Sequence, residues 1–185
     1  MSKNSLKPLT ELDTYCDKKR DDINVIIETP RENQNKLDYN PELGIFELAS
    51  VMPQGSVFPY DFGFIPSTLG EDGDPLDVLV LLDQPVPTGT LVRARLIGVI
   101  EAEQSEEGKV LRNDRLLAVA IHAHTHEHVK SLDDLRPGLV KEIQHFFVSY
   151  NQLKGREFKP VGTHGPKRAH ELLDGGVKRF NKEEK

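Results

Sequence analysis

The chain has 185 residues, 37% hydrophobic and 29% charged, which fits one globular domain of ordinary composition. Its 24 basic and 30 acidic side chains give a net charge of −6, which argues against a general nucleic-acid-binding protein, since such a protein needs a basic face. Cys16 is the single cysteine, so no intramolecular disulfide can form. No apolar run approaches the length of a membrane span and residues 1–10 lack an apolar signal segment, so we expect a cytoplasmic protein without membrane contact.

The first half of the chain predicts short strands. Residues 1–20 are polar and mixed in charge, and we interpret them as an N-terminal extension of a single domain that spans residues 21–185. The β-branched run at residues 23–27 predicts the first strand, which ends before a proline. Residues 36–51 read as a hairpin whose turn lies at residues 40–44.

The middle of the chain predicts a loop followed by buried strands. Residues 53–66 are dense in proline, glycine and aromatic side chains, which is typical of an ordered loop with short strands around it. The apolar run at residues 78–82 predicts a buried strand, and residues 91–100 and 116–121 predict two more.

The last third of the chain predicts helices. Apolar side chains recur every three or four residues from Leu139 to Leu153, so we expect a helix with one apolar face, preceded by a Ser131–Asp134 cap. A second helix is expected from Pro166 to Leu173, ended by the glycine pair at residues 175–176. Strands followed by two helices indicate an α+β, mainly β fold: a small β-barrel with C-terminal helices packed outside.

The most informative segment is an acidic bend in front of the strand at residues 78–82. Asp72, Asp74 and Asp77 place three carboxylates within six residues, and carboxylate oxygens are preferred ligands of Mg²⁺. A solvated acidic turn gives the same pattern. An EF-hand does not fit, because Leu76 occupies the fifth loop position and an aspartate the position that requires glycine.

The bend and several other segments resemble the family I soluble inorganic pyrophosphatases. The stretch Asp72–Val80 is similar to the family signature D-G-D-P-x-D-V-L-V. The other similar segments, in the family's order, are Val25–Pro30, Phe58–Ile65 and His145–Tyr150. The resemblance covers roughly residues 23–153, and it implies a closed five-stranded OB-like barrel and Mg²⁺-dependent hydrolysis of pyrophosphate to two phosphates.

The resemblance implies a role for each carboxylate. Asp72 and Asp77 would be metal ligands, and Asp74 would be the general base that takes a proton from a water activated by the metal. Glu28 would support the metal cluster through water. Two or more Mg²⁺ ions per site are expected, because a metal pair can activate the nucleophile and clamp the leaving oxygen. Without the resemblance, Glu28 is as readily the exposed end of a strand.

The resemblance also implies three substrate-binding residues. Lys36 falls where the family places a phosphate-binding lysine, and Tyr150 where it places a phosphate-binding tyrosine. Arg115 falls at a lysine position of the family. The residues alone leave other interpretations open, since lysine is usually exposed and the Tyr150 ring could belong to the helix core.

The sequence departs from the family pattern at several positions. Ser50 stands where the family has a phosphate-binding arginine, Phe62 where it has a tyrosine and Asn151 where it has a lysine. Two further aspartate ligands of the family align with neutral amides, Gln104 and Asn113.

Two accounts of these departures stay open. In one, the protein is an active pyrophosphatase whose second metal site is rebuilt from Asp114 and a nearby glutamate, Glu101 or Glu103. In the other, the fold is kept while the activity is weakened or redirected to another phosphate compound. A binding module without turnover is a third possibility, because a small barrel can serve many functions.

His122, His124, His126 and His128 alternate along the chain, and in an extended strand all four would face one side. Such a row could bind a transition metal or line a pH-sensitive subunit interface. The resemblance itself implies a homo-oligomer, since bacterial-type members commonly form hexamers.

Overall fold

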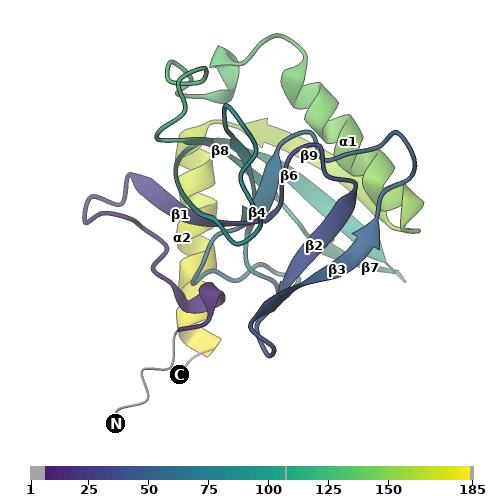
Figure 1. Ribbon diagram of the computed structural model, residues 1–185, viewed down its shortest axis with the longest axis horizontal. Coiled ribbons are helices and arrows are strands. Elements are labelled where there is room, and N and C mark those ends of the chain that lie inside the picture. Colours follow the sequence, from purple (N-terminus) through teal and green to yellow (C-terminus); the bar gives the residue numbers. More distant parts are fainter. Residues whose placement is uncertain (1–6, 107, 184–185) are drawn as a thin grey trace.

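The computed structural model describes residues 7–106 and 108–183, so residues 1–6 of the expected N-terminal extension lie outside the described part. The fold is mainly β with two α-helices (Figure 1). In chain order the elements are the 3₁₀ helix η1 (Leu9–Glu11), β1 (Asp22–Thr29), β2 (Asn35–Asn40), β3 (Ile45–Val51), β4 (Asp61–Phe64), β5 (Asp77–Leu81), β6 (Leu91–Glu106), β7 (Lys109–Arg112), β8 (Arg115–Ala120), η2 (Leu132–Asp134), α1 (Leu139–Leu153), β9 (Glu157–His164) and α2 (Pro166–Glu183).

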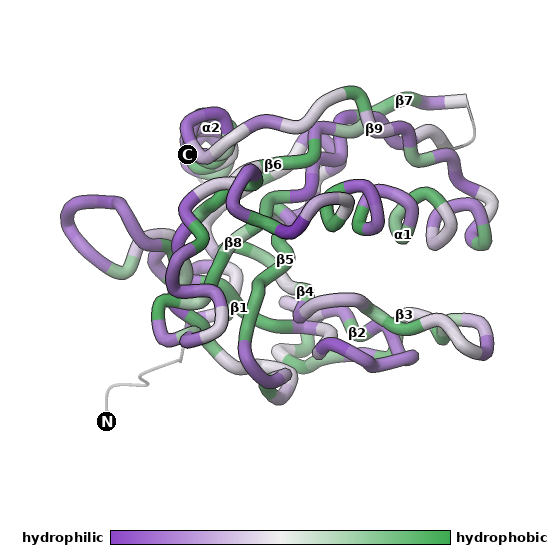
Figure 2. Tube along the Cα trace, turned by 90° about the horizontal axis from the view of Figure 1, so that it is seen from above, coloured by the Kyte–Doolittle hydropathy of each residue, from purple (hydrophilic) through white to green (hydrophobic). Residues whose placement is uncertain are grey.

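Most of the strands belong to one sheet. Among the described residues its order is β1-β4-β5-β8-β6-β7, with β9 paired along β6 and with a further pairing between β1 and β6. β5 and β8 run parallel, whereas the other pairs of this sheet are antiparallel. β2 and β3 form a separate hairpin. Figures 1 and 2 show α1 and this hairpin toward the same end of the molecule, with α2 away from both.

The core is built mainly from strand residues of the large sheet, and both helices contribute buried side chains to it. β5 is apolar and fully buried after its first residue, as Figure 2 shows by its hydrophobic colouring. Leu139, Ile143 and Phe147 form the buried face of α1, which matches the predicted helix and its spacing. The strands predicted at residues 23–27, 78–82, 91–100 and 116–121, and the hairpin at 36–51, are confirmed. Their ends differ by at most two residues, except that β6 continues to Glu106. None of the described helices is both long and apolar enough to span a membrane.

The second predicted helix was placed wrongly at its C-terminal end. α2 continues through Gly175 and Gly176 to Glu183 instead of ending at Leu173. The reason is tertiary: a Cβ on Gly176 would lie 2.6 Å from Leu76 Cδ1, so glycine lets α2 approach the acidic bend closely. The Gly176 carbonyl also accepts a hydrogen bond from Leu69 N at 3.1 Å. Packing therefore outweighs the low helix propensity of glycine.

Three strands were not predicted: β4, which lies inside the loop expected at residues 53–66, and β7 and β9. β9 contains Pro160 and Gly162, which normally interrupt strands. Among the described residues it pairs with β6 alone, and the register shifts between Glu101 and Ala102, where Pro160 is accommodated. β7 exists because β6 extends past the predicted end at residue 100 and folds back on itself.

Two local predictions also needed correction. The Ser131 and Asp134 capping box is present, but it caps η2, whereas α1 begins after Gly138. Residues 122–128 form turns rather than a strand, so the histidine row does not share one face. This loop is instead held by Asp83, whose carboxylate accepts hydrogen bonds from the backbone nitrogens of His124 (2.9 Å) and Thr125 (3.0 Å).

Candidate active site

The acidic bend is fixed by its own backbone. Gly70 N donates to the carbonyl oxygen of Asp74 at 2.7 Å, and Asp74 N donates to Asp72 Oδ1 at 3.3 Å. Gly73 has a φ of +91°, a conformation that other residues rarely adopt. The bend leads directly into β5, and Asp77 is held in place because it is the first residue of that strand.

Lys36 and Glu28 form a buried pair beside the bend. Their side chains are only 9% and 10% exposed, and Lys36 Nζ lies 3.5 Å from Glu28 Oε2. Lys36 also binds Asp38, which is the next residue on the same face of β2. Glu28 Oε1 accepts a hydrogen bond from Tyr39 N at 2.9 Å. Both predicted residues are thus buried and paired, so neither is the exposed strand end or surface lysine that the sequence left open.

The titration of this pair reflects its burial. Burial raises the pKa of Glu28 to about 7, although the nearby charge of Lys36 opposes the increase. Burial lowers the pKa of Lys36, but the charges of Glu28 and Asp38 outweigh this effect and the net shift is upward. Lys36 therefore remains a cation, and Glu28 exchanges its proton near neutral pH.

The three carboxylates of the bend repel each other. Burial raises the pKa of Asp74, and the charges of Asp77 and Asp38 raise it further, while Lys36 and Arg156 oppose the shift. Asp74 as a whole is exposed to solvent, so burial removes its carboxylate from water only in part. Burial likewise raises the pKa values of Asp72 and Asp77. A raised pKa makes Asp74 a better proton acceptor, and a cation bound at the bend would relieve the repulsion.

Arg115 lies on the inner side of the bend. It opens β8, its residue is 5% exposed, and its Nη1 lies 2.5 Å from Asp77 Oδ2. The same nitrogen donates to Asn113 Oδ1. Asn113 Nδ2 in turn donates to Gln104 Oε1 at 3.1 Å. The two amides that the sequence analysis singled out are therefore in contact with each other.

The carboxylate of Asp114 binds Arg112, whereas that of Asp77 binds Arg115. Its Oδ1 accepts hydrogen bonds from Ala102 N at 2.9 Å and from Arg112 Nη2 at 2.7 Å. Arg112 also binds Glu101, which is joined to Arg168 of α2 at 2.5 Å. Glu101 is thus held between two arginines.

A pocket of about 240 Å³ lies between the bend, the β7–β8 corner and α2. It is lined by Gly70, Glu71, Asp72, Pro75, Leu76, Asp77, Arg112, Asn113, Asp114, Arg168, Leu172 and Arg179. Asp114 therefore shares a pocket with Asp72 and Asp77, two of the predicted metal ligands.

The family model described as Inorganic pyrophosphatase matches residues 25–181, which is most of the chain. The chain belongs to the inorganic pyrophosphatase family. The resemblance drawn from its motifs is thereby confirmed.

Individual members of the inorganic pyrophosphatase family agree with this assignment. The inorganic pyrophosphatase of Thermus thermophilus is 36% identical over 167 residues, which cover 89% of this chain and 93% of that protein. Its crystal structure superposes with a TM-score of 0.86 and covers 94% of this chain and 99% of that chain. The Neisseria gonorrhoeae inorganic pyrophosphatase structure gives a TM-score of 0.83 at 32% identity, covering 93% and 98% of the two chains.

The donor set of this pyrophosphatase-family chain suits a hard cation, because its grouped ligands are carboxylate oxygens whose mutual repulsion an ion would relieve. Asp72, Asp77 and Asp114 all line one pocket. Within the ranges that the structure describes, however, no group of three or more His, Cys, Asp and Glu side chains lies close enough to hold an ion as the side chains stand. The four histidines of residues 122–128 likewise do not form such a group as their side chains stand.

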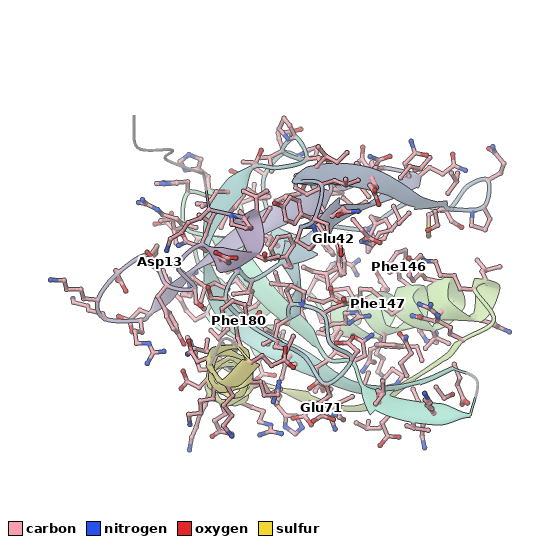
Figure 3. The ribbon with its side chains drawn as sticks, turned by 90° about the horizontal axis from the view of Figure 1, so that it is seen from below. Asp13, Glu42, Glu71, Phe146, Phe147 and Phe180 are labelled. Carbon is pink, nitrogen blue, oxygen red and sulfur yellow. The ribbon has the colours of Figure 1, made fainter. Side chains whose placement is uncertain are left out.

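Tyr150 lies apart from the carboxylates in the described contacts. Its ring stacks on Phe146 at 6.0 Å and meets Phe58 edge-on at 5.7 Å, with Lys154 Nζ 4.6 Å from the ring centroid. Figure 3 labels Phe146 and Phe147 on the same helix, α1. Phe58 and Phe62 join these rings to Lys36, whose Nζ lies 4.8 Å from the Phe62 ring centroid. The aromatic cluster thus forms the wall behind Lys36.

The positions that depart from the family pattern have clear local surroundings. Ser50 pairs with Lys36 across the β2–β3 hairpin, and its buried Oγ has no hydrogen-bond partner in the described part of the chain. Asn151 is buried and donates to the Phe147 carbonyl at 2.9 Å, so it serves α1 itself. Arg156, which lies beyond the end of α1, acts electrostatically on Asp74 and lowers its pKa.

Sequence reasoning missed Asp38 and Arg156. Asp38 could have been found, because a residue two positions from Lys36 on a strand shares its face. Arg156 follows the C-terminal end of α1, and only the tertiary structure brings its charge near Asp74.

Proposed function

We propose that this protein hydrolyses inorganic pyrophosphate to two phosphates with Mg²⁺ as cofactor. The observation that carries the proposal is the convergence of the acidic bend with Lys36, Glu28 and Arg115 in a chain of the inorganic pyrophosphatase family. Phosphoryl transfer depends mainly on positioning and charge stabilisation. It therefore needs carboxylates that gather divalent cations and buried cations that hold anionic oxygens.

In this proposal Asp74 is the general base. Its carboxylate lies at the exposed tip of the bend, where burial and the neighbouring carboxylates raise its pKa. It would accept the proton of the attacking water, and the charges of Lys36 and Arg156 oppose the rise of its pKa.

Asp72, Asp77 and Asp114 are the proposed direct ligands of Mg²⁺, and Glu28 supports the site through water. The support for Asp114 is that it lines the same pocket as the other two. Bound Mg²⁺ would lower the pKa of water and neutralise phosphate charge. The arginine-bound Glu101 is less suited to join them, because Arg112 and Arg168 already occupy its oxygens.

Lys36, Arg115 and Tyr150 are the proposed contacts to the phosphates. Lys36 presents an ammonium beside the carboxylates, and Arg115 has a guanidinium fork that suits phosphate oxygens. Tyr150 is the least supported of the three, because its described contacts are with aromatic rings and Lys154.

Phosphate release from pyrophosphate tests the proposal. We expect release at saturating Mg²⁺, its loss in EDTA, and a fall of about 10²–10⁴-fold in Asp74→Asn, the usual range for removal of a general base. Asp133→Asn is the matched control, because Asp133 is exposed at the start of η2, outside the proposed site. The absence of phosphate release by the wild type, or an Asp74→Asn rate equal to that of the control, would contradict it.

A substrate panel addresses the alternative of a redirected activity. Nucleoside triphosphates and pyrophosphate should be compared at the same Mg²⁺ concentration, and pyrophosphate should be the preferred substrate. Faster release from a nucleotide would favour the alternative instead.

The proposal also covers the barrel, the domain organisation, the assembly and the cellular location. The five strands β1, β4, β5, β8 and β6 would form the closed OB-like barrel, which their successive pairings and the β1–β6 pairing support. Residues 1–20 would be an extension of one domain over residues 21–185, the assembly would be a homo-oligomer, and the location would be cytoplasmic. The single cysteine is compatible with a reducing compartment.

A further inference from the structure

A buried arginine is built into the wall of the proposed site. Arg115 is 5% exposed, and its guanidinium carbon lies 5.0 Å from the Phe147 ring centroid and 5.4 Å from that of Phe158. Its Nη1 donates to Asn113 Oδ1 and to the Asp114 carbonyl (3.1 Å), and lies 2.5 Å from Asp77 Oδ2. Side chains from α1 and β9, together with the turn between β7 and β8, thus hold the cation in place.

Arg115 restricts where a divalent ion can bind. An oxygen of Asp77 is already occupied by a full positive charge at 2.5 Å, and a Mg²⁺ ion at that oxygen would lie against the guanidinium. The other oxygen of Asp77, Oδ1, has no cation against it in the described contacts, and Asp77 lines the same pocket as Asp72.

The neighbouring amides strengthen this restriction. Asn113 Oδ1 accepts from Arg115, and Asn113 Nδ2 donates to Gln104 Oε1 at 3.1 Å. The hydrogen bonds occupy both amide oxygens, and neither side chain carries the negative charge that attracts Mg²⁺. The row Asp77–Arg115–Asn113–Gln104 is therefore close to charge balance without any added ion.

We propose that the Arg115 guanidinium takes the place of one divalent cation in this active site, so that Mg²⁺ is bound on the Asp72 side and not between Asp77, Asn113 and Gln104. The proposal rests on the proposed function, since it concerns the same site. Arg115 then supplies as a fixed side chain part of the positive charge that the phosphates require, and it does so at any Mg²⁺ concentration.

Counting bound metal ions tests the proposal without an activity assay. Mn²⁺ is a suitable probe, because it prefers the same oxygen ligands and is visible by electron paramagnetic resonance. The full-length protein with Arg115→Met and Asn113→Asp removes the fixed cation and adds a carboxylate, and it should bind one more Mn²⁺ ion than the wild type. Arg115→Lys with Asn113→Asp keeps the cation as a matched control, and it should bind the same number as the wild type. Equal numbers in all three proteins would overturn the proposal.

Anomalous diffraction from wild-type crystals soaked in Mn²⁺ is a second test, and it does not depend on whether the variants fold. We expect anomalous peaks beside Asp72 and none coordinated by Asn113 Oδ1 or Gln104 Oε1. A peak bound to either amide oxygen overturns the inference but leaves the proposed function intact, because phosphate release is measured separately. A wild-type protein that binds Mn²⁺ nowhere overturns both.

Discussion

Lys36 Nζ lies 3.5 Å from Glu28 Oε2, and both side chains are about nine-tenths buried, so each is the counter-charge that makes the burial of the other acceptable. Removal of one partner of a buried pair leaves an uncompensated charge and is more costly than removal of both.

We expect Lys36→Met to lower the free energy of unfolding by roughly 3–5 kcal/mol at pH 8, because Glu28 would remain buried without its cation. Urea unfolding with EDTA present measures the change. The double variant Lys36→Met with Glu28→Gln should recover most of the loss. Lys109→Met, at an exposed position of β7, is the control, and a loss no larger than that of the control would contradict the expectation.

The pH dependence of stability should report Glu28. Its pKa is about 7 in the folded protein and 4.5 in the unfolded chain, so the folded state binds its proton more tightly. The cost of burying the ionised carboxylate is absent below the unfolded pKa, grows as the pH rises, and is complete above about pH 7. Relative to Glu28→Gln, the wild type should therefore gain about 1 kcal/mol when the pH falls from 8 to 6. A difference between the two proteins that stays constant with pH would show that Glu28 does not titrate in this range.

Alanine substitutions at the two glycines of α2 should change the stability of the protein in opposite directions. At Gly176 a Cβ would lie 2.6 Å from Leu76 Cδ1, so Gly176→Ala should cost about 1–2 kcal/mol through overpacking beside the acidic bend. At Gly175 the nearest atom, Arg179 Nη1, would be 3.5 Å away, so Gly175→Ala should stabilise by about 0.5–1 kcal/mol through helix propensity. Thermal unfolding of both variants decides the matter, and a stabilised Gly176→Ala protein would refute the packing argument.

Asp83 should contribute to stability only above acidic pH. Hydrogen bonds from Thr125 and from the backbone of His124 lower the pKa of Asp83 to about 2 from an ordinary 3.8. Its contribution is therefore present above pH 3.8 and is lost as the pH falls toward 2. Asp83→Asn should be less stable than the wild type at pH 7, with a difference that narrows between pH 4 and 2. A difference unchanged by acid would mean that the carboxylate charge plays no part.

The acidic bend, β5 and α1 could be predicted because their information is local. Asp72, Gly73 and Asp74 lie within three residues of one another, and the apolar residues of β5 and α1 follow regular spacings. The same local reasoning was wrong at Gly175 and Gly176, where a packing contact with Leu76, one hundred residues away, overrides propensity.

The sequence by itself determined the family, the strand-rich fold and the carboxylates of the bend, because each is written in contiguous residues. Only the tertiary structure decided which cations meet those carboxylates. Parallel pairing of β5 with β8 aligns Val78 with Leu116, and this register brings the preceding residues, Asp77 and Arg115, together. No local pattern encodes that register, since it depends on how the whole sheet packs.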